Sequence, residues 1–287
     1  GEDTESYYIV TALMKGGELF DRIVSKEEIY KITEKTAARL VLNMLEAVKY
    51  CHDNDVVHRD LKPENFVFAN KTPESDIVLI DYGCARIVKD EEVIEDVVGT
   101  AYYLAPELAA AALDNYRQKG SKVSGKVGAP KPRTGKILKA ADVWSMGVIA
   151  YVMMTGRPPF PGRSNVAIFE ASCLKQLVFP EKDARYHHKL KLNEHFKDFI
   201  QKALIKDPAE RLSIEDAIRH PWVQGVEASD YQLNKDVIHY LKQFSYQSKL
   251  KREITRVLAA NMTAEPTEQV MRHFKRLDAD GDGTLDL

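Results

Sequence analysis

Three polar motifs, in a fixed order, constrain this chain of 287 residues more than its composition does. They are HRDLKPEN (58–65), DYG (81–83) and GTAYYLAPE (99–107). Each motif alone consists of residues that are common in polar turns, so each alone is weak evidence for a site. All three together, separated by short gaps, are very improbable as ordinary turns, and they predict one catalytic centre.

The motifs resemble those of the eukaryotic serine/threonine protein kinases, and the resemblance covers residues 7–222. It implies an α+β, protein-kinase-like fold with a mostly helical large lobe over residues 15–225. Residues 1–14 would be a remnant of the small lobe, formed by the strand-like stretch YYIVTALM and the hinge. No G-x-G-x-x-G precedes HRD, so we expect that the sequence was cut at its front and lacks the glycine-rich loop and the ATP-binding lysine.

The resemblance also implies how the motif residues act. Phosphoryl transfer requires charge neutralisation, metal ions and an aligned nucleophile rather than covalent help. Asp60 would accept the proton of the attacking hydroxyl, and Lys62 would place a positive charge beside the transferring group. Asn65 and Asp81 would hold Mg²⁺ against the phosphates. Thr100 would bond to the loop that carries Asp60, next to the acceptor residue.

ATP is the cofactor that the resemblance implies. The backbones of Ala12 and Met14 and the side chain of Val67 would line the adenine slot, with Thr11 at its back. Glu18, which opens the helix after the hinge, would bond to the ribose.

Two glutamates bear on the choice of substrate. Glu18 and Glu64 resemble the carboxylates that basophilic kinases offer to arginines upstream of the acceptor. We therefore expect protein substrates with basic residues near the acceptor. The alternative is that both are exposed glutamates at helix ends.

Other motif residues are expected to be structural. Asp142 in DVWS resembles a buried carboxylate that braces the catalytic loop. Glu107 and Arg211 resemble the two partners of a buried ion pair. Tyr82 replaces the usual phenylalanine of this motif, and we expect it to pack as an aromatic plug.

The segment between Gly83 and Gly99 contains no Ser, Thr or Tyr, and it carries the acidic run KDEEVIEDVV (89–98). In the kinases that these motifs resemble, the arginine at the position of Arg59 faces a phosphate on this segment. We expect a carboxylate, that of Glu95, to face it here, so phosphorylation of this segment would not control activity.

The stretch over residues 114–140 holds eight Lys or Arg, one Asp, four Gly and two Pro. This composition cannot bury an apolar face and predicts a mobile surface loop, inserted into the large lobe. A basic patch for an acidic partner is the alternative.

Residues 226–266 are expected to form an autoinhibitory junction. Within them, residues 237–261 form a basic helical run, in which Val237, Leu241 and Phe244 share one face. A second set lies roughly opposite: Ile254, Val257 and Leu258. A helix with two such faces can exchange partners, and the basic residues Lys249, Lys251, Arg252 and Arg256 make it similar to a calmodulin target.

Residues 267–287 resemble the entering helix and partial loop of a first EF-hand. Asp278, Asp280, Asp282 and the carbonyl of Thr284 would bind Ca²⁺, but the sequence ends at the tenth of twelve loop positions. The order of kinase, junction and calcium loop resembles the calcium-dependent protein kinases of plants and protists. It implies a Ca²⁺-regulated enzyme whose junction, 237–258, binds its own calmodulin-like domain.

Two alternatives remain open. A calmodulin-regulated kinase would not carry DADGDG after the helix. A pseudokinase would not need Asp60, Asn65 and Asp81 together. The net charge of −2 predicts no binding of nucleic acid, no leader is evident, and we expect a cytoplasmic monomer. Cys51, Cys84 and Cys173 are far apart and form no C-x-x-C pair, so we expect all three to be reduced. Membrane association through a missing N-terminus is possible on the resemblance.

Overall fold

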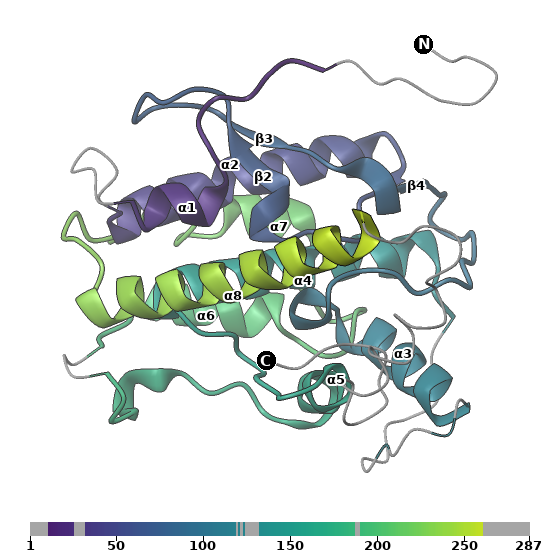
Figure 1. The fold of residues 1–287 in the computed structure, drawn as a ribbon. Helices are drawn as coiled ribbons and strands as arrows, with labels where there is room; N and C mark the ends of the chain where they lie inside the picture. The colour runs from purple at the N-terminus through teal and green to yellow at the C-terminus, as the bar shows by residue number, and fades with distance from the viewer. Residues whose placement is uncertain are drawn as a thin grey trace.

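The computed structural model describes residues 11–25, 32–118, 120, 123, 132–186 and 190–260. These residues form a mostly helical molecule with two small antiparallel sheets, which confirms the predicted α+β class (Figure 1). The helices are α1 (Leu19–Ile23), α2 (Glu34–Asp53), α3 (Pro106–Gln118), α4 (Gly135–Thr155), α5 (Asn165–Leu174), α6 (Glu194–Ala203), α7 (Ile214–Arg219) and α8 (Lys235–Ala260). The strands are β1 (Val56–Val57), β2 (Phe66–Phe68), β3 (Ile77–Leu79) and β4 (Arg86–Ile87); β1 pairs with β4 and β2 with β3.

The centre of the core is α4. Its residues are buried around the whole circumference from Ala141 to Thr155, as expected for a helix that is apolar on every side. The side chain of Thr134 accepts from the backbone of Ile137 and caps the first turn, and Gly156 ends the helix in the left-handed conformation. By length and composition α4 could cross a membrane, but 78% of its apolar window is buried inside the protein. It is therefore a core helix of the protein.

The catalytic motifs are carried by loops that α2 and α4 support. The buried side chains of α2 recur at helical spacing, and this helix packs on α4 and β3. The hydroxyl of Thr33 accepts from the backbone of Thr36 at the start of α2. Loops between β1 and β2, and after β3, then bring residues 58–65 and 81–83 to one side of α4.

The predicted strand over residues 7–14 lies partly outside the described residues. Its described part, 11–14, forms no strand. The chain is attached to β2 only after it, where the backbones of Lys15 and Gly16 donate to the carbonyls of Ala69 and Phe68 at 3.1 and 2.9 Å. Gly16 lies so close to β2 that a Cβ there would be 2.4 Å from the Cβ of Phe68. A strand needs a paired neighbour, which these four residues do not have among the described ones.

The predicted basic loop over residues 114–140 is too long at both ends. Residues 114–118 complete α3, and α4 begins at Gly135. The apolar side chains of Tyr116 and Leu138 pack against the core and extend each helix into the basic stretch. Most of the residues between the two helices lie outside the described residues, so the loop and its alternative as a basic patch stay predictions.

Helix α8 crosses the protein in front of α4 and contacts both α4 and α1 (Figure 1). Val237 and Leu241 are fully buried and Phe244 packs against the core, which confirms the first predicted apolar face. Gly156 makes this contact close, because a Cβ there would lie 2.7 Å from the Cβ of Tyr240. The side chains of Val257 and Leu258 are not described, and the calcium loop with Asp278, Asp280, Asp282 and Thr284 lies outside the described residues.

Candidate active site

Asp142 braces the catalytic loop, as predicted. Its side chain, only 2% exposed, accepts from the backbone amides of His58 and Arg59 at 3.0 Å each and contacts Nε2 of His52 at 2.9 Å. Arg59 has a left-handed backbone, with φ of 67°, which is unfavourable for a residue with a side chain. The two hydrogen bonds from Asp142 hold this conformation and so orient the next residue, Asp60.

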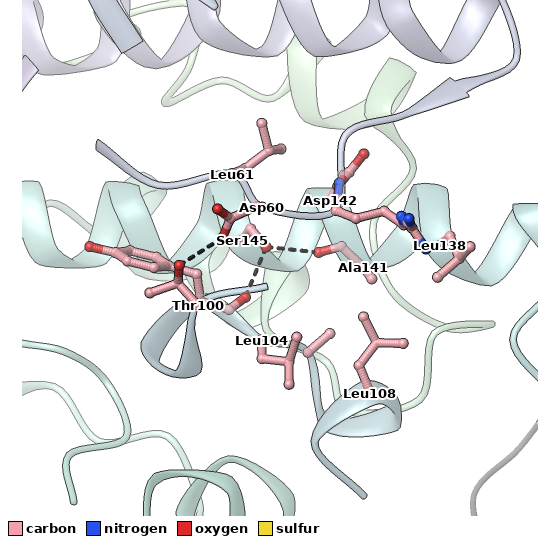
Figure 2. A pocket seen from close by; sticks show the side chains of 12 residues that line it. Asp60, Leu61, Thr100, Leu104, Leu108, Leu138, Ala141, Asp142 and Ser145 are labelled. Carbon is pink, nitrogen blue, oxygen red and sulfur yellow. Dashed lines mark hydrogen bonds between the residues drawn. The ribbon is translucent and has the colours of Figure 1, made fainter. Parts of the chain in front are cut away.

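Asp60, Lys62, Asn65 and Thr100 meet at one point. Oδ1 of Asp60 accepts from the Thr100 hydroxyl at 2.7 Å, and Oδ2 contacts Nζ of Lys62 at 2.6 Å. The Lys62 ammonium also lies 3.5 Å from the Thr100 hydroxyl. The side chain of Asn65 donates to the backbone carbonyl of Asp60 at 2.8 Å. Figure 2 shows Thr100 beside the carboxylate of Asp60. One carboxylate is thus held between an ammonium and a hydroxyl on a braced loop.

Asp81 lies on the neighbouring loop. The backbone of Ile80 donates to the carbonyl of Asn65 at 2.8 Å, which keeps the two loops adjacent. Asp81 is in the left-handed conformation, and its Oδ1 accepts from the backbone of Gly83 at 3.3 Å. The amide oxygen of Asn65 and the exposed carboxylate of Asp81 are hard oxygen donors, the type that Mg²⁺ prefers, so the donor set fits this ion.

A small cavity lies behind Asp60, lined by the side chains in Figure 2. Its volume of about 10 Å³ is at the lower limit for one water molecule, so it is not a substrate site. The hydroxyl of Ser145 donates to the carbonyl of Tyr103 at 2.8 Å and also lies 3.2 Å from the carbonyl of Ala141, one turn earlier on the same helix. Sequence reasoning missed Ser145, which ties the loop after Thr100 to the core helix.

Tyr82 is less enclosed than predicted. Its ring lies 5.3 Å from that of His58, and its hydroxyl lies 3.8 Å from Sγ of Cys51. Burial raises the pKa of Tyr82 to about 12, with smaller contributions from Cys51. The residue as a whole is nevertheless 50% exposed. A plug must be covered on both faces, and among the described residues only one aromatic ring, that of His58, packs on it.

The carboxylate that faces Arg59 is Asp96, so the prediction of Glu95 was wrong. Nη1 of Arg59 lies 3.0 Å from both oxygens of Asp96, while its Nε donates to the carbonyl of Cys84 at 2.7 Å. Glu95 is exposed, and its backbone carbonyl accepts from Arg133. The acidic run was enough to predict a carboxylate here. It could not decide between neighbours, because successive side chains of a non-helical segment point in different directions.

The predicted buried ion pair between Glu107 and Arg211 is confirmed. Nη1 and Nη2 of Arg211 donate to the two oxygens of Glu107 at 2.8 Å each, and the side chains are 0% and 3% exposed. The guanidinium also donates to the carbonyls of Ala140, Ile205 and Lys206. This set of bonds satisfies the buried charge on all sides and connects α3 to the chain between α6 and α7.

The residues predicted for the nucleotide are less enclosed. Ala12 is exposed and Met14 partly exposed, and both precede the contact with β2. Val67 on β2 is buried and forms an isolated antiparallel bridge with Glu18 at the start of α1. The structure therefore brings Glu18 and Val67 together, but the described residues do not close a slot around Ala12 and Met14.

Three carboxylates form what we call the acidic surface: Glu18 and Asp21 around α1, and Glu64 in the turn before β2. Helix α8 covers it. The ring of Phe244 packs on Phe20 and on Tyr102, with centroid distances of 6.4 and 5.6 Å. Lys249 forms an ion pair with Asp21. Sequence reasoning missed Asp21, although its position three residues after Glu18 places the two on the same face of a helix.

Comparison with known proteins agrees with this geometry. Residues 1–223 match the family model described as protein kinase domain. Calcium-dependent protein kinase 29 of Arabidopsis thaliana is 35% identical over 284 residues, or 99% of this chain and 47% of that protein. Calcium-dependent protein kinase 10 of Oryza sativa subsp. japonica is 36% identical over 285 residues, which are 99% of this chain and 42% of that protein. The chain thus spans less than half of either relative. It belongs to the protein kinase family, and over almost its whole length it is similar to calcium-dependent protein kinases.

Proposed function

We propose that this chain is the catalytic large lobe and the regulatory junction of a protein serine/threonine kinase. The observation that carries the proposal is the position of the Asp60 carboxylate, held at 2.6 Å from Lys62 and at 2.7 Å from Thr100 on a loop braced by Asp142. Phosphoryl transfer to a Ser or Thr hydroxyl requires a proton acceptor and a positive charge beside the transferring group. Asp60 and Lys62 supply these two groups next to each other.

Each residue then has one task. Asp60 accepts the hydroxyl proton, Lys62 neutralises charge on the transferring group, and Thr100 keeps the carboxylate oriented. Asn65 and Asp81 would hold Mg²⁺, which supplies charge neutralisation for the ATP phosphates. Val67 and the backbone near Met14 would contact the adenine.

The acidic surface suits substrates with basic residues near the acceptor. Carboxylates of Glu18 and Glu64 lie next to the Asp60 loop and would pair with arginines upstream of the acceptor. Helix α8 covers this surface, so we propose that it is autoinhibitory. In the complete protein, Ca²⁺ would draw residues 237–258 onto calcium-binding hands, a regulation supported by the names of the relatives.

The proposed reaction can be tested on the complete protein that contains this chain, with Mg·ATP and a serine peptide that carries upstream arginines. Asp60→Asn should lower the transfer rate by about 10²–10⁴-fold. Asp53→Asn removes an exposed carboxylate of α2 and should leave the rate unchanged. Full activity of the Asp60 variant would reject the proposal. The 287-residue chain, which has no glycine-rich loop sequence before HRD, should by itself transfer no phosphate.

Substrate preference has its own test. Glu18→Gln and Glu64→Gln should raise KM for the arginine peptide more than for the same peptide with alanines. An equal change for both peptides would remove the basic-residue preference and leave the kinase assignment intact.

Control by the segment 84–98 is also testable. The guanidinium of Arg59 is already paired with the carboxylate of Asp96, and this segment contains no hydroxyl side chain. Phosphatase treatment of the complete protein, made in bacteria and assayed with Ca²⁺ so that α8 is already released, should therefore leave its activity unchanged. Asp96→Ala should lower activity, because it leaves Arg59 with fewer partners. A large loss after phosphatase treatment would contradict this mode of activation.

A further inference from the structure

Asp21 holds two residues of α8 that are one helical turn apart. The hydroxyl of Ser245 donates to Oδ1 of Asp21 at 3.2 Å, and the ammonium of Lys249 forms an ion pair with Oδ2. Both contacts are partly buried. They join α8 to α1 at positions separated by more than 220 residues in sequence. Besides the packing of Phe244, the attachment of this part of α8 therefore depends on one carboxylate and on a hydroxyl that donates to it.

The surroundings of Ser245 are acidic. Ser245 and Lys249 line a small cavity together with Glu18 and Glu64, while Phe20, Tyr103 and Phe244 form its apolar wall. Among the side chains that the structure describes, the charged groups near Ser245 are the carboxylates of Glu18, Asp21 and Glu64 and the ammonium of Lys249. A neutral hydroxyl is compatible with these charges, but an additional anion is not.

The sequence around Ser245 is one that a kinase with a preference for basic residues would accept. Lys242 lies three residues before it, and Lys249 and Lys251 follow. Ser245 is partly exposed, and its neighbours Tyr246 and Gln247 are exposed. Because its hydroxyl is bonded within a helix, it can enter an active site only when this part of α8 opens transiently.

We propose that Ser245 is a phosphorylation site and that its phosphate keeps the second half of α8 away from the acidic surface. Ser245 Oγ attacks the γ-phosphorus of Mg·ATP. The new O–P bond forms as the bond from the γ-phosphorus to the β–γ bridging oxygen breaks, ADP leaves, and the hydroxyl proton passes to the carboxylate base of the acting kinase.

The phosphate prevents the return of α8 for three reasons. It carries a charge of about −1.5 to −2 and repels Asp21, Glu18 and Glu64. The hydrogen that Ser245 donated to Asp21 is lost. Lys249, four residues later on the same helix, pairs with the phosphate and leaves Asp21. The helix itself is not broken, because the new pair lies along it, and the buried first half at Val237 and Leu241 keeps its contacts.

The effect on catalysis rests on the proposed function, whereas the modification and the release of α8 do not require this chain to be active. The full chain is incubated with Mg·ATP and an added serine kinase that prefers basic substrates, and phosphate is located by mass spectrometry. Hydrogen exchange is then measured over residues 242–250. We expect phosphate at Ser245 and exchange at least tenfold faster than in the untreated chain, with residues 141–155 unchanged. Absence of phosphate at Ser245, or unchanged exchange in the phosphorylated chain, would overturn the proposal.

Matched variants separate charge from modification. Ser245→Glu should accelerate exchange over residues 242–250, while Gln247→Glu, the same change of charge at an exposed position two residues later, should not. Adding Asp21→Asn to Ser245→Glu should reduce the acceleration, because one of the repelling carboxylates becomes neutral. An equal effect of the two glutamate variants would show that charge on α8 in general, rather than the place of Ser245, releases the helix. Full transfer activity of Asp60→Asn in the complete protein would reject the kinase function and leave these measurements valid.

Discussion

The catalytic loop and the second half of α8 are both held by carboxylates, but in different ways. Asp142 and Glu107 are buried, and every bond they make is to a buried or backbone partner. Asp21 is 33% exposed, and its partner Lys249 is 36% exposed. A buried charge cannot lose one partner without a large penalty, whereas water replaces a lost partner at the surface. The contacts that hold the catalytic loop are therefore costly to break, whereas the polar contacts of the second half of α8 can be replaced by water.

The largest expected effect is the loss of stability when a buried ion pair is broken. Glu107→Gln leaves the guanidinium of Arg211 buried without its countercharge, and should lower the free energy of unfolding by about 3–5 kcal/mol. Urea denaturation followed by far-UV circular dichroism measures it. As a control, Asp53→Asn removes the exposed pair with Lys49, and should change stability by less than about 0.5 kcal/mol. Similar losses in the two variants would show that burial does not distinguish these pairs.

A smaller, local effect is expected on α8. Phe244→Ala removes the aromatic contacts with Phe20 and Tyr102, and should weaken the attachment of residues 242–250 by about 1–2 kcal/mol. Local hydrogen exchange should rise there and stay unchanged in α4. Tyr246→Ala, at a side chain that is 61% exposed, is the control. A general loss of stability after the Phe244 change would mean that α8 belongs to the core and cannot be released alone.

Acid should lower the free energy of unfolding through the buried side chain of His220. Burial lowers the pKa of His220 below its ordinary 6.5, although Nε2 lies 2.9 Å from Asp198. Nδ1 accepts from the backbone of Trp222 at 3.3 Å, a bond that only the neutral ring can accept. The unfolded chain thus binds more protons, and stability falls as pH drops below about 6.5. His220→Gln should reduce the loss between about pH 7.5 and pH 5.5 in urea denaturation. An unchanged pH dependence in this variant would assign the loss to other groups.

The smallest expected effect is that of salt on the ion pair between Lys249 of α8 and Asp21. Lys249→Met removes the ion pair with Asp21 and should cost about 0.2–1 kcal/mol of local stability at low ionic strength. The difference from the unchanged chain should disappear near 1 M salt, where the screening length is about 3 Å. Exchange over residues 242–250 at low and high salt measures it. A difference that persists at high salt would show that packing by the lysine stem, rather than charge, holds this turn.

The sequence by itself determined the catalytic motifs, the helical large lobe and the first face of α8. Apolar residues recur at helical spacing in α2, whereas α4 contains a continuous apolar run, and both patterns are local properties of the sequence. Which residues meet at the catalytic loop was implied by the resemblance of HRDLKPEN, DYG and GTAYYLAPE to protein kinase motifs. Asp142, Glu107 and Arg211 followed from the same resemblance.

Only the tertiary structure decided which carboxylate faces Arg59, how far Tyr82 is covered, and which residues receive α8. Asp96 and Glu95 are equivalent in composition, and the choice between them depends on the path of a non-helical segment. Asp21 meets Ser245 and Lys249 across more than 220 residues, so no local pattern contains that contact. Long-range contacts of this kind depend on how α1, α4 and α8 pack together, and packing is a property of the whole fold.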